Sequence, residues 1–321
     1  METLHILVTI PLDNSNKIRF ENAAQNCIFE YISPTNVTYE QVQKANIIIG
    51  NVPPKFVINS PNLKWLHLNY AGADEYQKDS IIPKSAILTN SRGAYGLAIS
   101  EHLLAMLLEI KKKLYLYRDN QNKHIWKSEG SVTSIYNSTA LIVGMGDIGG
   151  EFAKRIKALG AYVIGIKRDI SNKPDYVDEL YTMDSIKELL PKADIVSVSL
   201  PSTPQTYKFF SEEVLSLTKK GSVFLNVGRG NTVDTNALYK LLKAGHFEGV
   251  GLDVTDPEPL PPEHPLWSIP NAVITPHISG HYNLHATLEK IIDIAYKNLC
   301  LYISGKKLIN IVSCPHKETN N

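Results

Sequence analysis

The chain has 321 residues, enough for two ordinary domains, and its 43% hydrophobic and 20% charged residues are typical of a globular protein. Thirty-three lysines and arginines against 32 aspartates and glutamates leave a formal net charge of +1 at pH 7. This near-neutral balance excludes binding to nucleic acid or to a membrane surface that is driven by net charge.

The first hundred residues predict short buried strands. Each is a brief apolar run bounded by Pro, Asn or Gly, as strands of a parallel sheet tend to be. The runs cover residues 4–10, 46–50, 63–69 and 86–90. A helix is predicted from Ser100 to Asn120, because leucines recur there at helical spacing and basic residues follow them. Residues 119–138 are polar and irregular, which indicates a connecting arm.

A second alternation of strands and helices follows the arm. Its predicted strands cover residues 139–143, 162–166, 179–182, 194–200, 222–228, 249–254 and 272–276. Asp234 is placed to cap the helix that begins after it. Strands that alternate with helices indicate a parallel sheet covered on both faces. The last predicted helix lies within residues 283–305, and if it packs back on the first sheet, the N-terminal domain is discontinuous.

A glycine-rich turn lies between a strand and a helix. Gly144, Gly146 and Gly149 form the pattern G-x-G-x-x-G directly after the apolar run 139–143. In this setting the first glycine allows a tight turn and the second lets the backbone approach a pyrophosphate. The third lets helix and strand pack closely, with the phosphates at the positive end of the helix. The sequence therefore predicts a dinucleotide site.

A basic pair stands where NAD-binding folds of this type carry an acid. The acid that grips the ribose 2′-hydroxyl is expected about 20 residues after the turn. Lys167 and Arg168 occupy that place, at the end of the strand predicted over 162–166. An arginine there accommodates a 2′-phosphate, so NADP is the predicted cofactor. The alternative is that both charges are solvated and NAD binds.

Three more polar residues follow predicted strands. Arg229 lies between two glycines, Glu258 lies among prolines, and His277 follows the strand predicted over 272–276. Ligands of open α/β sheets bind outside the carboxyl ends of the strands. An arginine, a carboxylate and a histidine are therefore expected to converge beside the nicotinamide.

These motifs together resemble the D-isomer-specific 2-hydroxyacid dehydrogenases. The resemblance rests on Gly144–Gly149, SLPSTPQT (199–206), NVGRG (226–230), LDVTDPEPLP (252–261) and TPHISG (275–280). It implies an α/β fold of two Rossmann-like, doubly wound parallel-sheet domains, of which the outer, flavodoxin-like one is discontinuous. The implied substrate-binding domain comprises residues 1–98 and 288–321, and the dinucleotide-binding domain residues 99–287. The resemblance also implies a homodimer, with the arm of about 109–138 near the dimer contact.

The resemblance also implies roles for individual residues. His277 is the acid/base, Glu258 orients its ring and stabilises the charged form, and Arg229 binds the substrate carboxylate and polarises the carbonyl. Backbone N–H groups around Ala71 and Gly72 receive the substrate carboxylate. The implied cofactor contacts are Gly144, Gly146, Asp147, Ile148, Gly149, Lys167, Arg168, Pro201, Thr206, Val227 and Asp253. The activity expected is hydride transfer between NADP(H) and a small 2-oxo or D-2-hydroxy acid.

Several points stay open in the sequence. The substrate side chain and the physiological direction are not readable, and a dinucleotide-sensing corepressor of the same fold is the alternative function. Cys27, Cys300 and Cys314 form no CxxC pair and are odd in number, which predicts incidental thiols and no metal site. No signal peptide and no apolar run of roughly 18 residues is recognisable, so a cytoplasmic protein is expected.

Overall fold

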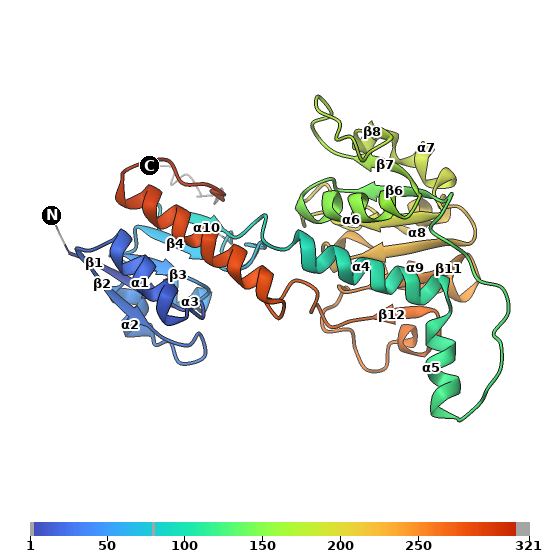
Figure 1. The fold of residues 1–321 in the computed structure, drawn as a ribbon, viewed down its shortest axis with the longest axis horizontal. Helices are drawn as coiled ribbons and strands as arrows, with labels where there is room; N and C mark the ends of the chain where they lie inside the picture. Colours follow the sequence, from blue (N-terminus) through green and yellow to red (C-terminus); the bar gives the residue numbers. More distant parts are fainter. Residues whose placement is uncertain (1–2, 79–80, 313–321) are drawn as a thin grey trace, which may run out of the picture. The chain divides into compact units, whose positions relative to one another are not determined.

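The structure is a computed structural model that describes residues 3–78 and 81–312. The chain divides into two compact units, one formed by Met1–Ala94 with Tyr282–Asn321 and the other by Tyr95–His281 (Figure 1). Cys27 and Cys300 are free thiols, whereas Cys314 lies outside the described residues. The first unit is therefore built from both ends of the chain.

The first unit contains a parallel sheet that, over the described residues, has five strands in the order β2-β1-β3-β4-β5. The strands are β1 (Leu4–Val8), β2 (Cys27–Tyr31), β3 (Ile47–Ile49), β4 (Trp65–Leu68) and β5 (Ile87–Asn90). This order is that of flavodoxin-like folds, as predicted. Strand β2 was not predicted, because it lies at the sheet edge, where its residues alternate between half-buried and exposed instead of forming an apolar run.

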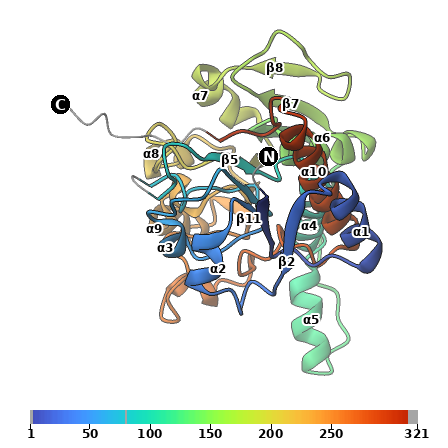
Figure 2. The ribbon, with the colours of Figure 1, turned by 90° about the vertical axis from the view of Figure 1, so that its left-hand side faces the viewer.

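Helices cover this sheet, and the last helix of the chain is among them. They are α1 (Asn14–Ala23), α2 (Tyr39–Lys44), α3 (Pro54–Val57) and α10 (His285–Ile303). Figures 1 and 2 show α10 beside α1. The Phe20 and Tyr296 rings lie 5.6 Å apart between centroids, and Arg19 Nη1 lies 2.8 Å from Asp293 Oδ1. The C-terminal helix thus completes the N-terminal unit.

A buried histidine connects β4 to the end of β5. Trp65 Nε1 donates to Thr89 Oγ1 at 2.8 Å, and His67 Nδ1 lies 2.8 Å from the same oxygen. His67 Nε2 lies 3.2 Å from Ser91 Oγ. Burial lowers the pKa of His67 to about 3. Because the Ser91 hydroxyl donates to Leu68 O at 2.9 Å, it accepts from His67 Nε2. Nδ1 of the neutral ring therefore accepts from Thr89, and these contacts fix the position of the chain after β5.

The second unit contains a larger parallel sheet, with seven strands among the described residues in the order β12-β11-β10-β9-β6-β7-β8. The strands are β6 (Thr139–Val143), β7 (Tyr162–Ile166), β8 (Glu179–Tyr181), β9 (Ile195–Val198), β10 (Ser222–Asn226), β11 (Phe247–Leu252) and β12 (Ala272–Ile274). The order reverses between β6 and β9, which is the switch point where doubly wound sheets bind dinucleotides. The predicted fold class is confirmed.

Two helices of this unit precede its first strand, and the others lie between its strands. They are α4 (Gly96–Lys111), α5 (Leu114–Asn122), α6 (Asp147–Ala158), α7 (Ile186–Leu189), α8 (Glu212–Ser216) and α9 (Thr235–Lys243), with short 3₁₀ turns η1 (Met183–Ser185), η2 (Leu190–Lys192), η3 (Gly230–Thr232) and η4 (Pro265–Ser268). Asp234 caps α9, as predicted, by accepting from Ala237 N at 3.0 Å. Helix α4 packs against α6 and β11. These contacts bring the start of the unit close to the strands that carry the site.

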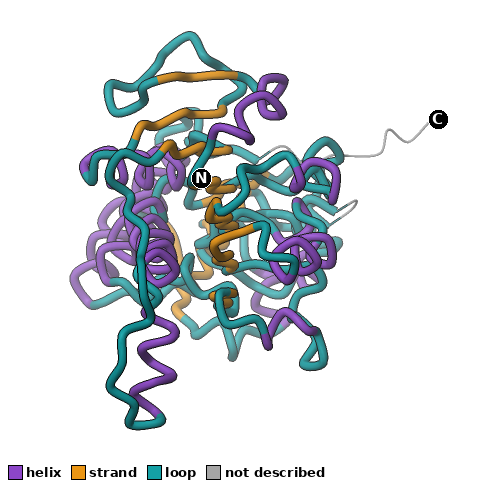
Figure 3. Tube along the Cα trace, turned by 90° about the vertical axis from the view of Figure 1, so that its right-hand side faces the viewer, coloured by secondary structure: helices purple, strands orange, loops and turns teal. Residues whose placement is uncertain are grey.

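The single helix predicted from Ser100 to Asn120 is wrong, because two helices occupy this stretch. Helix α4 begins earlier, at Gly96, and ends at Lys111, and α5 begins at Leu114. Lys113 has a left-handed backbone with φ of 55°, which interrupts the helix. Figure 3 shows α5 and the teal loop that returns beside it, so the predicted arm begins with a helix.

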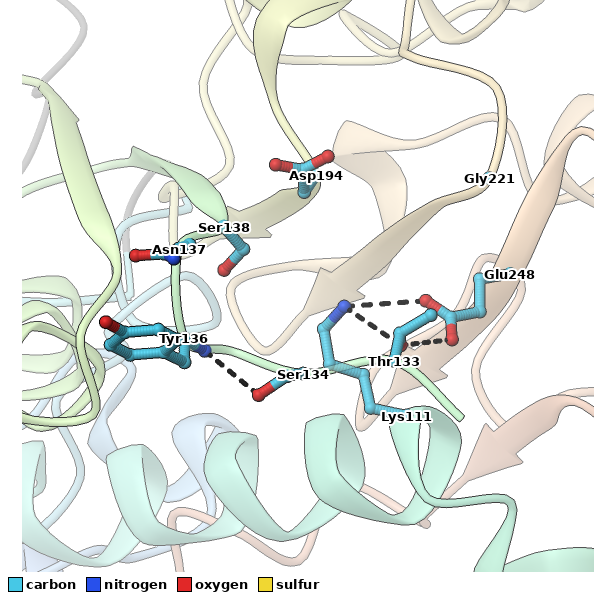
Figure 4. A pocket seen from close by; sticks show the side chains of 9 residues that line it. All are labelled: Lys111, Thr133, Ser134, Tyr136, Asn137, Ser138, Asp194, Gly221 and Glu248. Atoms are coloured by element: carbon cyan, nitrogen blue, oxygen red, sulfur yellow. Dashed lines mark hydrogen bonds and ion pairs between the residues drawn. The ribbon is translucent and has the colours of Figure 1, made fainter. Parts of the chain in front are cut away.

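Three consecutive lysines fasten the returning loop of the arm. Lys111 Nζ lies 3.4 Å from Glu248 Oε2 and 3.3 Å from Thr133 Oγ1 (Figure 4). Lys112 Nζ donates to Thr133 O and Lys113 Nζ donates to Glu129 O, each at 2.8 Å. Lys111 is only 3% exposed, so its charge needs this partner. The returning loop is therefore held by lysines at and just after the end of α4, one of which is also paired with β11.

The pocket drawn in Figure 4 has a volume of about 240 Å³ and lies beside these lysines. Ser138 and Gly221, which line it, directly precede β6 and β10. It therefore opens at the amino ends of the parallel strands, opposite the edge where the predicted site residues lie.

Candidate active site

The glycine turn connects β6 to α6 as predicted. A Cβ on Gly149 would lie 2.0 Å from Gly144 O, so only glycine allows this approach of helix to strand. A Cβ on Gly146 would meet nothing within 4 Å, and Gly146 caps α6 without any side-chain hydrogen bond. No side chain of the N-cap residue therefore occupies the first N–H groups of α6, which include those of Asp147 and Ile148. An uncapped helix start next to open space fits a pyrophosphate.

The Asp147 side chain has a separate role. Its Oδ2 accepts from Gly96 N at 2.8 Å, at the start of α4. Helix α4 has no side-chain cap from its own N-cap residue. The carboxylate therefore caps a neighbouring helix, where negative charge is favourable.

The basic pair lies directly beside the glycine turn. Ile166 O, the last carbonyl of β7, accepts from Gly144 N at 3.1 Å and from Met145 N at 3.0 Å. Lys167 and Arg168 follow it, and both are exposed. The acid after them, Asp169, accepts from Ser171 N at 3.0 Å, and hydrogen bonds from Ser171 lower its pKa. The Asp169 carboxylate is therefore hydrogen-bonded within its own loop.

The loop after β9 contains Pro201 and Thr206 and is closed by its own hydroxyl groups. Thr206 Oγ1 donates to Pro201 O at 2.7 Å and accepts from Thr203 N at 2.8 Å. At the start of the loop, Ser199 Oγ donates to Gly144 O at 2.8 Å. The two segments on either side of the switch point thus contact each other.

Arg229 lies in a tight turn after β10. The turn begins with buried Val227, and Gly228 N donates to Asn226 Oδ1 at 3.0 Å. Asn226 Nδ2 donates to Arg229 O at 3.1 Å, and Arg229 Nη1 donates to Gly228 O at 2.9 Å. Asn226 is 1% exposed and holds both ends of the turn. This positioning role was not predicted, although Asn226 opens the quoted NVGRG motif.

Glu258 and His277 form the closest ionic contact of the site. Glu258 lies in the loop after β11 and His277 follows β12. His277 Nδ1 lies 2.6 Å from Glu258 Oε1, and the two side chains are 43% and 42% exposed. An ionised carboxylate only accepts, so Nδ1 carries a proton and Nε2 is the ring nitrogen left to face a reactant. This is the arrangement of an oriented acid/base.

Asp253 is 1% exposed and is bonded to residues on both sides of His277. Its Oδ1 accepts from Thr275 Oγ1 at 2.6 Å and from Ile278 N at 2.9 Å. Its Oδ2 accepts from Ser279 N at 3.1 Å and from Ser279 Oγ at 2.5 Å. The contact with a nicotinamide amide stays a prediction for this residue, whose carboxylate is already engaged by donors of its own unit.

Ala71 and Gly72 lie in the first unit, in the loop after β4, and both are half-buried. Asn90 Nδ2 donates to Ala71 O at 2.5 Å. Asn51 and Asn69 exchange two hydrogen bonds, from each backbone N–H to the other side-chain Oδ1, at 2.8 and 2.9 Å. These asparagines follow or end neighbouring strands and hold the loop. They were not predicted, because their partners depend on the register of the sheet.

Within the second unit, the predicted site residues share one edge of the sheet. They follow β6, β7, β9, β10, β11 and β12, all of which are parallel. Over the described residues, no group of three or more His, Cys, Asp or Glu side chains could hold a metal ion. None of the helices described there is both long and apolar enough to cross a membrane. The edge thus combines a dinucleotide turn with an oriented histidine and an arginine.

Comparison with known proteins identifies the family. The model of the D-isomer specific 2-hydroxyacid dehydrogenase NAD binding domain matches residues 104–279. The glyoxylate reductase of Thermofilum pendens is 31% identical over 257 residues, which cover 77% of this chain and 74% of that enzyme. The D-3-phosphoglycerate dehydrogenase of Mycobacterium bovis is 34% identical over 223 residues, covering 69% of this chain and 42% of that enzyme.

A solved structure agrees with these sequence matches. The D-isomer specific 2-hydroxyacid dehydrogenase family protein from Aeromonas salmonicida superposes with a TM-score of 0.85 at 28% identity, covering 98% of this chain and 100% of that one. Fold, motif order and sequence similarity therefore agree over most of the chain. The protein belongs to the D-isomer-specific 2-hydroxyacid dehydrogenases, a family of NAD(P)-dependent oxidoreductases.

Proposed function

We propose that this protein reduces a small 2-oxo acid to the D-2-hydroxy acid with NADPH. The observation that carries the proposal is the 2.6 Å contact of His277 Nδ1 with Glu258 Oε1, at the same sheet edge as Arg229 and the glycine turn. We assign dinucleotide binding to the seven-stranded unit and substrate binding to the five-stranded unit. Ala71 and Gly72 stay predicted contacts for the substrate carboxylate.

The residues act as follows in this proposal. The bound nicotinamide supplies a hydride to the substrate carbonyl carbon. His277 donates a proton from Nε2 to the carbonyl oxygen, and in the reverse direction it accepts that proton. Glu258 holds the ring through Nδ1 and stabilises the imidazolium. Arg229 offers a planar pair of N–H donors to the substrate carboxylate, which fixes its orientation.

The preference for NADP rests on the end of β7. Lys167 and Arg168 are exposed one and two residues after the carbonyl that holds the glycine turn. The acid of this loop, Asp169, accepts a hydrogen bond from Ser171. A guanidinium beside the adenosine ribose favours a 2′-phosphate, whereas an acid there repels it. This arrangement supports NADP over NAD.

The test is a panel of 2-oxo acids assayed with NADPH and with NADH. Glyoxylate is the first member, since a glyoxylate reductase is among the relatives, and hydroxypyruvate and branched or aromatic 2-oxo acids follow. One charge-assisted hydrogen bond contributes roughly 1.5–3 kcal/mol. We therefore expect kcat/KM to be about ten to a few hundred times higher with NADPH.

Two outcomes of the panel would count against the proposal. Equal efficiencies, or a preference for NADH, would reject the NADP assignment and leave the reaction class intact. Absence of turnover with every acid and both cofactors, while the dinucleotide still binds, would instead favour a dinucleotide-sensing binding protein.

We also propose that the arm joins two copies of the chain. Its returning loop carries exposed apolar side chains, and the Trp126 side chain is fully exposed. Large apolar side chains exposed together mark interaction surfaces. The contacts of Lys111, drawn in Figure 4, and those of Lys112 and Lys113 hold the returning loop within one chain. A homodimer that buries Trp126 accounts for the exposed apolar side chains and for an arm held in a fixed position.

The dimer is tested by the mass of the protein in solution. We expect twice the chain mass for the wild type and a dissociation constant at least about 30-fold higher for Trp126→Ser, since a buried interface tryptophan commonly contributes about 2 kcal/mol or more. Ile18→Ser is the control, because Ile18 is also well exposed, at 58%, but lies on α1 in the other unit. A wild type of single-chain mass, or a Trp126→Ser variant that dimerises as tightly as wild type, would contradict the proposal.

A further inference from the structure

The carboxylate of Asp253 accepts hydrogen bonds from one short segment of the chain. Thr275, Ile278 and Ser279 together give it four hydrogen bonds of 2.5–3.1 Å, two to each oxygen. An ionised carboxylate has about four acceptor positions, so the set is complete. The segment that supplies all four donors contains His277 at its centre.

The backbone of His277 is attached to the same residue. His277 N donates to Asp253 O at 2.8 Å and to Thr275 O at 3.1 Å. Its φ of 51° lies in the left-handed region, which a residue with a Cβ rarely adopts. Such a conformation persists only when surrounding contacts hold it. The hydrogen bonds to Asp253 are those contacts.

A histidine from α4 is the outermost member of this network. His102 Nε2 lies 2.9 Å from Thr275 Oγ1. The single hydroxyl proton of Thr275 is donated to Asp253, because the carboxylate can only accept. His102 Nε2 therefore carries a proton and donates it to Thr275 Oγ1. The bonds form one directed chain, from His102 through Thr275 to Asp253.

We propose that His102 is a positioning residue for the reaction. It fixes the Thr275 hydroxyl on Asp253, and Asp253 in turn holds the 275–279 segment so that the His277 ring faces the substrate carbonyl. Because α4 packs against β11, His102 connects the start of this unit to the reacting group. The inference rests on the proposed role of His277.

The test uses His102→Ala and the conservative His102→Gln, whose amide Nε2 can still donate to Thr275. Displacing a reacting group by about 1 Å costs up to about a hundredfold in rate. For His102→Ala we expect kcat to fall about ten- to a hundredfold while the NADPH dissociation constant stays within about threefold. His102→Gln should recover most of the rate. Amide hydrogen exchange of Ile278 and Ser279 should accelerate in His102→Ala but not in His102→Gln.

His246→Ala is the matched control. His246 Nε2 makes the same contact, 2.9 Å from Thr218 Oγ1, but lies before β11 at the opposite edge of the sheet. We expect its kcat to stay within about twofold of wild type. Should His102→Ala fail to fold, Thr275→Val removes the hydroxyl that His102 contacts, with little change in volume. It is expected to show the same fall in kcat and the same faster exchange of Ile278 and Ser279.

Three outcomes separate the inference from the proposed function. Unchanged kcat and unchanged exchange in His102→Ala or Thr275→Val, with an inactive His277→Asn, would overturn the inference alone. An equal loss of kcat in His246→Ala would also overturn it, since the effect would then be general destabilisation. An active His277→Asn would reject the proposed acid/base role of His277, and the exchange of Ile278 and Ser279 would still report whether His102 holds the segment.

Discussion

Replacing His277 by asparagine is expected to lower kcat for 2-oxo acid reduction by about two to four orders of magnitude, the range that a positioned general acid contributes. Asparagine retains a polar side chain but has no group that can deliver a proton at neutral pH. Binding of NADPH should change little, because the substitution does not touch the glycine turn or the basic pair. The measurement is kcat with the best substrate of the panel, together with the cofactor dissociation constant.

The control for this variant is His285→Asn. The His285 side chain is 82% exposed on α10 and lies in the other unit, so its loss should leave kcat unchanged. The His277 side chain is 43% exposed and not part of the core, so thermal unfolding of His277→Asn should resemble that of wild type. A His277→Asn enzyme with kcat within a few-fold of wild type would show that another group delivers the proton.

Replacing Arg168 by alanine should reduce kcat/KM with NADPH by about ten to a few hundredfold, and leave kcat/KM with NADH nearly unchanged. The 2′-phosphate loses its charge-assisted hydrogen bond, whereas a ribose 2′-hydroxyl had no comparable partner. Lys167→Ala should show a smaller change in the same direction. The measurement is the ratio of the two efficiencies for each variant.

Lys187→Ala controls for the change in net charge. Lys187 is an exposed lysine of the same unit that pairs with Glu213 Oε1 at 2.9 Å on α8. If its removal shifts the cofactor ratio as far as Arg168→Ala does, the effect is long-range electrostatics instead of phosphate recognition. A fall of both efficiencies in Arg168→Ala, with their ratio constant, would assign Arg168 to binding of the common part of the two cofactors.

The sequence was sufficient for the parts of the site that depend on local pattern. Gly144, Gly146 and Gly149 follow an apolar run and open a helix, and this spacing reflects the local geometry of a strand, a turn and a helix. The ends of buried strands can also be read from the sequence, because an apolar run gives way there to polar residues, Gly or Pro. Since all strands of the sheet are parallel, those ends necessarily share one edge, and Glu258 and His277 were expected there together.

The remaining parts depend on contacts between distant segments. The bond of His102 to Thr275 joins residues 173 positions apart, and that of Gly96 to Asp147 joins residues 51 apart. No periodicity encodes such pairs. Strand β2 was missed for a different reason, because an edge strand with one solvent face lacks the apolar run. The break at Lys113 was missed because lysine is a good helix former, and its left-handed backbone is set by its surroundings.

The position of α10 in the chain also constrains how the protein folds during synthesis. The seven-stranded unit is continuous in sequence, and its last residue emerges from the ribosome before α10 does. Until then the five-stranded unit lacks the helix that covers α1, and the rings of Phe20 and Tyr296 have not met. The half of the molecule translated first is therefore the half whose core is finished last.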